Sequence, residues 1–142
     1  MKKFFNDHDQ ETIIIFCHGN WGEQIIEDMQ DNFGISKNYL IYSLTNDLAV
    51  SDYKTKIKED INRLDHLPSL FLTDLMEGST STCALKISLE FDQIPVVTGL
   101  NLPLLLEIDR LNHFELSNLN PLLEKVSQKT NCELLKTYGL NN

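Results

Sequence analysis

The stretch TIIIFCHGNWGEQ (12–24) joins two patterns of different period. Its first part, TIIIFC (12–17), is a continuous apolar run rich in β-branched residues, which is typical of a strand buried on both faces of a sheet. The apolar residues of WGEQIIEDMQDNFG (21–34) then recur at helical spacing, and the final glycine provides a stop. The sequence therefore predicts a buried strand followed by a helix, with His18 at the junction.

The same alternation continues along the chain. Further strands are predicted at YLIYSL (39–44), SLFLTD (69–74), IPVVTG (94–99) and, shortest of all, CELLK (132–136). Further helices are predicted at 51–64, 79–90, 101–112 with Asn101 as its cap, and 120–130 with Pro121 at its first helical position. Strands that alternate with helices indicate βαβ units with right-handed crossovers. We therefore expect an α/β fold with a doubly wound, mostly parallel sheet, strand order 2-1-3-4 and helices on both faces.

Length and composition fit one domain that spans residues 1–142. Apolar residues make up 42% of the chain and charged residues 23%, as in ordinary soluble proteins. The 21 acidic residues outnumber the 12 basic ones, and the net charge is −9. This balance disfavours direct binding to nucleic acid, which depends on clustered Lys and Arg, and favours a basic protein partner.

Segments that would place the chain in a membrane or outside the cell are not expected. No stretch approaches the roughly 20 apolar residues needed to cross a bilayer, and the N-terminus MKKFFNDHDQ lacks the apolar core of a secretory signal. Cys17, Cys83 and Cys132 are widely spaced, which indicates reduced thiols in a cytoplasmic protein. The segment NDHDQE (6–11) is interpreted as a solvated lead-in, and neither a metal nor another cofactor is expected.

The parallel sheet predicts where functional groups gather. In open α/β sheets they lie beyond the carboxyl ends of the strands, where the strand order reverses. His18 follows the first strand and Asp74 ends the third, and the order 2-1-3-4 makes these strands neighbours. A carboxylate that accepts from one ring N–H leaves the other nitrogen free as a nucleophile. The helix starts near Asn20 and at the turn EGST (77–80) offer N–H and hydroxyl donors for an anion, so this pattern favours a histidine that carries a phosphoryl group.

The same residues fit other interpretations. On spacing alone it is equally plausible that His18 packs near a helix end and that Asp74 only caps the next helix. A receiver domain needs an acidic pair where Cys17 and His18 stand, and a cysteine-based phosphatase needs an arginine soon after Cys17. A flavodoxin-like cofactor loop is a poor match to GNWGEQ. Trp21 fits either a docking surface beside His18 or packing at the helix start.

Three stretches carry a resemblance to a known family. HGNWGEQIIEDMQDNFG (18–34), LFLTDLMEGSTSTCALK (70–86) and PVVTGLNLPLLLEI (95–108) resemble, in order and spacing, the signature stretches of mannose-family enzyme IIA domains of the bacterial phosphoenolpyruvate-dependent sugar phosphotransferase system. The resemblance implies that His18 is the phosphorylation site and that Asp74 orients its ring. It also implies that Ser79 forms a hydrogen bond with the phosphoryl group.

The resemblance further implies the partners of such a chain. A carrier of this type takes its phosphoryl group from HPr and passes it to a IIB component for sugar uptake. It stays cytoplasmic and reaches a membrane permease only through these partners. It also implies a homodimer that exchanges a short C-terminal antiparallel strand, here around Cys132–Lys136.

One turn departs from the family pattern. Where the family has Gly-Gly-Ser-Pro, this chain has Glu77-Gly78-Ser79-Thr80. A glutamate that faced the pocket would repel a phosphoryl dianion. A second hypothesis is therefore a regulatory or partner-binding IIA-like domain with weakened turnover.

Overall fold

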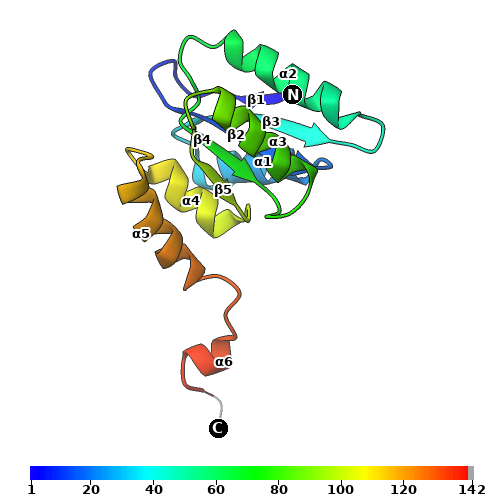
Figure 1. Cartoon of the computed structure of the whole chain (residues 1–142). Helices are drawn as coiled ribbons and strands as arrows, with labels where there is room; N and C mark the ends of the chain where they lie inside the picture. Colours follow the sequence, from blue (N-terminus) through cyan, green and yellow to red (C-terminus); the bar gives the residue numbers. More distant parts are fainter. Residues whose placement is uncertain (141–142) are drawn as a thin grey trace.

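A five-stranded mixed sheet forms the centre of the computed structural model, which describes residues 1–140 (Figure 1). The strands are β1 (Lys2–Phe4), β2 (Thr12–His18), β3 (Asn38–Leu44), β4 (Leu70–Thr73) and β5 (Val96–Thr98). They lie side by side in the order β1-β3-β2-β4-β5, and β2 to β5 are mutually parallel. The predicted α/β class is confirmed. Counted among the four parallel strands, the observed order is 2-1-3-4.

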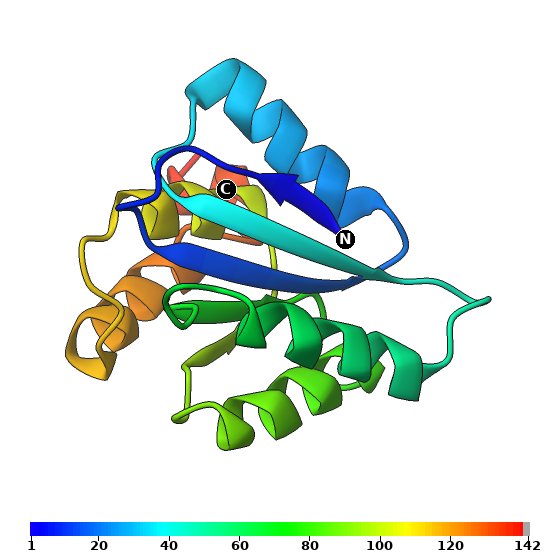
Figure 2. The same ribbon diagram turned by 90° about the horizontal axis from the view of Figure 1, so that it is seen from above.

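The described part of the chain contains six helices. They are α1 (Trp21–Phe33), α2 (Val50–Asn62), α3 (Ser79–Glu90), α4 (Leu102–Arg110), α5 (Leu116–Ser127) and α6 (Leu134–Thr137). Figure 2 shows α1 on one side of the sheet and α2 and α3 on the other. No helix within residues 1–140 has both the length and the apolar character that crossing a membrane would require.

The central strand β2 explains why the sequence begins with an uninterrupted apolar run. Ile13 to Cys17 have no exposed surface, because β3 and β4 flank the strand and helices cover both faces of the sheet. Alternate side chains of a strand point to opposite faces. Ile13, Ile15 and Cys17 accordingly join the core beneath α1, α4 and α5, whereas Ile14 and Phe16 join the core beneath α2 and α3.

The edge strand β1 was not predicted from the sequence. It pairs antiparallel with β3, so that Lys2 lies opposite Ile41 and Phe4 opposite Tyr39. Only Phe4 of its three residues is buried, with 8% of its surface exposed. A segment this short gives no periodic signal, and its place in the sheet depends on hydrogen bonding to the edge of β3.

The strand predicted at Cys132–Lys136 is wrong for the single chain. Residues Leu134–Thr137 form the one-turn helix α6, which lies away from the sheet (Figure 1). The Glu133 carboxylate caps this turn by accepting from the N–H groups of Leu135 (3.1 Å) and Lys136 (2.7 Å). A strand needs a neighbour to complete its hydrogen bonds, and none of the described strands pairs with this segment.

Two predicted helix starts have different outcomes. The cap at Asn101 is confirmed, because its side-chain oxygen accepts from the Leu104 N–H at 2.9 Å. The start at Pro121 is wrong, since α5 begins at Leu116 and includes the proline. Burial of Leu119, which is 1% exposed, stabilises the turn before the proline and offsets the one backbone hydrogen bond that Pro121 cannot donate.

Gly22 allows α1 to approach β2 closely. A Cβ atom built on Gly22 would lie 2.5 Å from the Cys17 sulfur and 3.3 Å from its Cβ. We expect Gly22→Ala to lower the free energy of unfolding by about 1–3 kcal/mol, measured by urea denaturation. In a Cys17→Ala background, Gly22→Ala should lower the free energy of unfolding by a smaller amount, because the sulfur that the new methyl group would meet is absent. Equal costs in both backgrounds would contradict this explanation.

Candidate functional site

His18 is the last residue of β2, at the carboxyl end of the sheet. Gly19 follows with φ of 63°, a left-handed conformation that favours glycine and lets the chain turn at once toward Asn20, the residue before α1. The Gly19 N–H donates to the Leu44 carbonyl at 2.9 Å, which fixes this turn to the end of β3. The His18 side chain remains 42% exposed, so its ring is accessible from solvent.

Asp74 holds both the main chain and the ring of His18. Its Oδ2 accepts from the His18 backbone N–H at 2.8 Å and lies 2.7 Å from His18 Nδ1. The carboxylate side chain is only 3% exposed. Because a carboxylate can only accept, the neutral ring carries its proton on Nδ1, and Nε2 keeps a free lone pair. The structure thus brings together the two residues that the sequence predicted to be neighbours.

The second oxygen of Asp74 also accepts two hydrogen bonds. Oδ1 accepts from the Thr80 hydroxyl at 2.7 Å and from the Leu75 N–H at 2.9 Å. Burial acts to raise the pKa of Asp74, but the hydrogen bonds from His18 and Thr80 and the charge of His18 together hold that pKa below its ordinary value. Asp74 is therefore ionised at neutral pH despite its burial.

The start of α3 lies against the His18 ring. Gly78 precedes the helix with φ of 133°, and a Cβ built there would lie 3.6 Å from His18 Cε1. The first intrahelical bond runs from the Thr82 N–H to the Gly78 carbonyl at 3.1 Å. The N–H groups of Ser79, Thr80 and Ser81 precede it, as at any helix start. This position beside the ring suits an anionic group, and Ser79 is the first residue of the helix.

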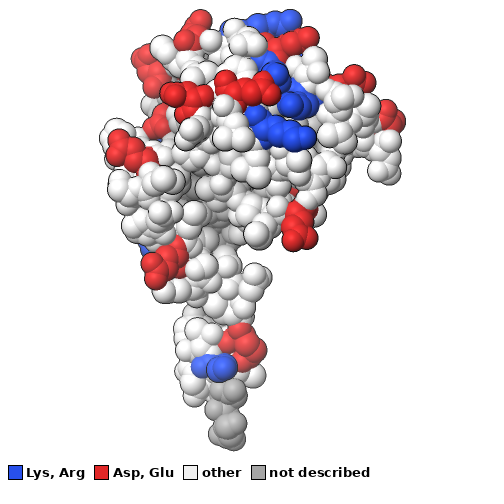
Figure 3. Space-filling model, viewed as in Figure 1, with Lys and Arg blue, Asp and Glu red and all other residues white. Residues whose placement is uncertain are grey.

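Positive charge gathers near this helix start. Figure 3 shows Asp and Glu scattered over the visible face, whereas Lys and Arg gather over α2 and α3. A cavity of about 470 Å³ between these helices is lined by Gly78 and Ser79 and also by Lys54 and Lys86. Lys54 also lies 3.6 Å from Glu90. In a chain of net charge −9, the groove beside the His18 site is therefore locally basic.

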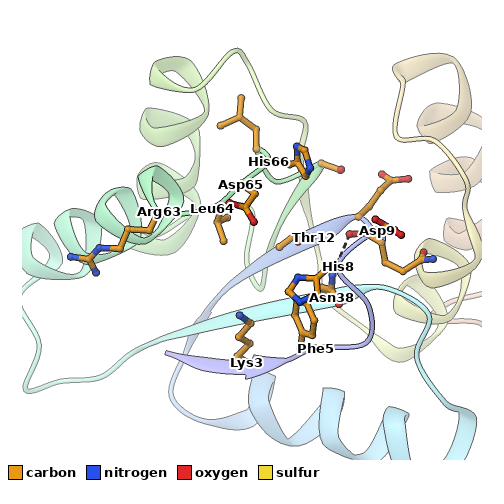
Figure 4. A pocket seen from close by; sticks show the side chains of 14 residues that line it. Lys3, Phe5, His8, Asp9, Thr12, Asn38, Arg63, Leu64, Asp65 and His66 are labelled. Atoms are coloured by element: carbon orange, nitrogen blue, oxygen red, sulfur yellow. Dashed lines mark hydrogen bonds between the residues drawn. The ribbon is translucent and has the colours of Figure 1, made fainter.

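A second cavity lies at the opposite end of the sheet. It measures about 580 Å³ and includes Thr12 and Ser69, which stand at the amino ends of β2 and β4 (Figure 4). Its two histidines, His8 and His66, share it with side chains of both charges, and the His8 ring packs edge-on against Phe5 at 4.8 Å. Among the residues described, no group of three or more His, Cys, Asp or Glu could hold a metal ion.

The two cysteines in the folded core do not form a reactive site. Cys17 and Cys83 are buried, and burial raises the pKa of each thiol to about 11. Protonated thiols are poor nucleophiles, which removes the cysteine-based alternative. Cys132 is exposed near the C-terminus.

Sequence reasoning missed the partner of one residue of the site. It expected the hydroxyl in this turn at Thr80 to serve as a donor to an anion, whereas the structure shows it donating to Asp74. The available signal was a hydroxyl residue in the first turn of the helix that follows Asp74. Trp21 stands at the start of α1 with 42% of its surface exposed, which is compatible with docking rather than with burial at the helix start.

Comparison with known proteins identifies the family. The family model described as "PTS system fructose IIA component", the mannose-type IIA family, matches residues 12–127. The chain belongs to this family, and the resemblance seen in the sequence is confirmed. No curated protein matches the chain.

Solved structures share the fold. The chain has a TM-score of 0.74 with the PTS IIA protein associated with the fucose utilization operon of Streptococcus pneumoniae, at 23% identity over 93% of this chain and 98% of that one. The mannose/sorbose-specific IIA subunit from Enterococcus faecalis gives a TM-score of 0.69 at 24% identity, over 84% and 88%. The EIIA component from Streptococcus agalactiae gives 0.70 at 20% identity, over 89% and 98%.

The lowered pKa of Asp74 predicts that the ionised carboxylate stabilises the fold and that acid removes this stabilisation. This contribution is present above the carboxyl pKa of the unfolded chain and is lost as the pH falls through the lower folded-state pKa. We expect the free energy of unfolding to fall more steeply between about pH 5 and pH 2 in the native chain than in Asp74→Asn. Urea denaturation at several pH values in this range tests the prediction, and Asp65→Asn is the control because Asp65 is exposed. Identical pH profiles for the native chain and Asp74→Asn would contradict the prediction.

Proposed function

We propose that this chain is a phosphohistidine carrier that accepts a phosphoryl group from HPr on His18 and passes it to a IIB component for sugar uptake. The observation that carries the proposal is the 2.7 Å contact between His18 Nδ1 and Asp74 Oδ2. This contact directs the free lone pair of the ring to Nε2, on a side chain that is 42% exposed. Membership of the IIA family supports the same role.

The reaction is a displacement at phosphorus. The Nε2 lone pair of His18 forms a bond to the phosphorus of phospho-HPr, and the bond from that phosphorus to the donor nitrogen breaks with its electron pair. Asp74 stabilises the positive charge that develops on the ring, because it is ionised and already in contact with Nδ1. The second step reverses these roles, with the nucleophile of the IIB component attacking the same phosphorus.

The phosphoryl oxygens require donors in fixed positions. We assign this role to the first N–H groups of α3 and to the Ser79 hydroxyl, because Gly78 brings this helix start against the His18 ring. Lys54 and Lys86 add positive charge in the adjoining cavity. Glu77 lies in the same turn and is exposed, so solvent screens its charge.

Phosphorylation by a reconstituted donor system tests the proposal. Incubation with phosphoenolpyruvate, enzyme I and HPr should add one acid-labile phosphoryl group, detected by intact mass, and His18→Ala should abolish the gain. His66→Ala is the matched control, since His66 lies at the opposite end of the sheet and should leave the gain unchanged. If the His18→Ala variant still gains a phosphoryl group, another residue is the acceptor and the proposal is wrong.

A regulatory IIA-like domain is the second candidate. The chain has a TM-score of 0.66, at 12% identity over 93% of this chain and 98% of that one, with a protein from Enterococcus faecalis described as a sigma-54 interaction domain protein. The feature of this chain that suits slow turnover is Glu77, because solvent screening weakens but does not abolish the repulsion between its carboxylate and a phosphoryl group. A chase of the phosphorylated chain with a IIB component separates the two candidates, because a carrier loses its phosphoryl group and a regulatory domain retains it.

We further propose a cytoplasmic, single-domain chain that forms a homodimer through its C-terminal segment. Leu134, Leu135, Tyr138 and Leu140 are apolar residues with 54–72% of their surface exposed. Apolar side chains this concentrated on a short segment favour contact with another surface. A second copy would supply the sheet edge that the segment lacks within one chain. The chain then reaches a membrane permease only through the IIB component.

Truncation tests the assembly. Deleting residues 131–142 should convert a dimer into monomers or aggregates, measured by light scattering, because the segment that joins the subunits and covers the sheet edge is then removed. A deletion variant that stays dimeric would place the interface on another part of the chain.

A further inference from the structure

We propose that Thr80 is a positioning residue that holds the Asp74 carboxylate in the orientation that serves His18. For its effect on transfer this inference rests on the proposed function, whereas its effect on the His18–Asp74 pair does not. The contact that carries it is the 2.7 Å hydrogen bond from the Thr80 hydroxyl to Asp74 Oδ1.

Thr80 is suited to this task by its position and its rigidity. It is the second residue of α3 and has no exposed surface. A β-branched side chain packed in this way has few rotamers available. The hydroxyl is therefore held toward Asp74, and water has no free access to compete for the bond.

The bond determines which oxygen faces the ring. A carboxylate can rotate about its Cβ–Cγ bond and exchange its two oxygens. Thr80 and Leu75 both donate to Oδ1, so Oδ2 remains for the backbone N–H and the ring of His18. Without the hydroxyl, Oδ1 would keep an unfilled lone pair at a site where the side chain is 3% exposed. The carboxylate would then gain by turning away from the ring or by taking up a proton.

Two neighbouring hydroxyls do not share this role. Thr73 and Ser81 are also buried, but they lie 2.8 Å from each other, and both donate to the Leu75 carbonyl. They fix the backbone of the turn after β4 rather than the carboxylate. A proline at position 80, as in the Gly-Gly-Ser-Pro turn that the family has here, would offer no hydroxyl at all. Three titratable groups interact with the Asp74 charge: the charge of His18 lowers the pKa of Asp74, and the negative charge of Asp74 raises the pKa of Cys17 and of Tyr53.

Three variants isolate the hydroxyl. Thr80→Val removes it at nearly constant volume, and Thr80→Ser restores a hydroxyl without the methyl group. Thr73→Val is the matched control, because it removes a buried hydroxyl beside Asp74 that does not contact the carboxylate. Thr80→Ala replaces Thr80→Val if the valine methyl group prevents folding.

The readouts are chosen to respond to orientation and not to stability alone. In Thr80→Val we expect the ¹³C titration of the Asp74 carboxyl to move to higher pH and the ¹⁵N shifts of the His18 ring to report a smaller share of the Nδ1–H tautomer. We also expect transfer from saturating phospho-HPr to slow by about tenfold, with KM unchanged, in line with the loss seen when a hydrogen-bond partner that orients a metal-ligating side chain is removed. Thr80→Ser should recover all three values, and Thr73→Val should leave them unchanged.

The outcomes separate this inference from the proposed function. Native titration and tautomer values in Thr80→Val, or an equal shift in Thr73→Val, would overturn the role of Thr80. A native chain that accepts no phosphoryl group would overturn the carrier function instead. The two spectroscopic readouts would still decide the role of Thr80 in that case.

Discussion

A single carboxylate oxygen, Oδ2 of Asp74, accepts from both the backbone and the ring of His18. The backbone bond joins the end of β2 to the residue after β4. The ring bond fixes the proton of the imidazole on Nδ1. Because one atom makes both contacts, the orientation of the ring is coupled to the pairing of two neighbouring strands. The rigidity of the sheet is thereby transmitted directly to the His18 side chain.

The burial of β2 makes this coupling possible. Its residues 13–17 are fully enclosed, and β3 and β4 fix its position on both sides. Its end therefore has little freedom, and the turn at Gly19 leads directly into α1. On the next strand the turn into α3 brings Gly78 to the same edge. Two helix starts thus meet at one exposed ring, as expected where the strand order of a parallel sheet reverses.

The sequence predicted those parts of the fold that have a periodic or local signal. The buried run at 12–17, the helix at 79–90 and the cap at Asn101 each depend on residues close in the chain, and each is found in the structure. The segments β1 and α6 could not be predicted in the same way. A three-residue edge strand depends on its partner strand, and a short C-terminal segment takes the conformation that its surroundings allow.

The candidate site, like the fold, was predicted from the sequence only in part. Topology placed His18 and Asp74 on neighbouring strands, and the structure brings them to 2.7 Å. The contact of Thr80 with Asp74 was not predicted, because it depends on how the first turn of α3 returns toward the end of β4. Sequence spacing gives the distance between two residues along the chain, but not the direction of their side chains.

The four donors around Asp74 have a consequence for which atom can react. A carboxylate at the end of the third strand is itself the phosphoryl acceptor in receiver domains, where it forms an acyl phosphate. Here His18, Leu75 and Thr80 occupy both oxygens of Asp74, and the side chain is 3% exposed. Its lone pairs are engaged, and the approach to a phosphorus atom is closed. The same hydrogen bonds that orient Asp74 toward the ring therefore withdraw it as a competing nucleophile, and of these two side chains only the ring keeps a free lone pair, on Nε2.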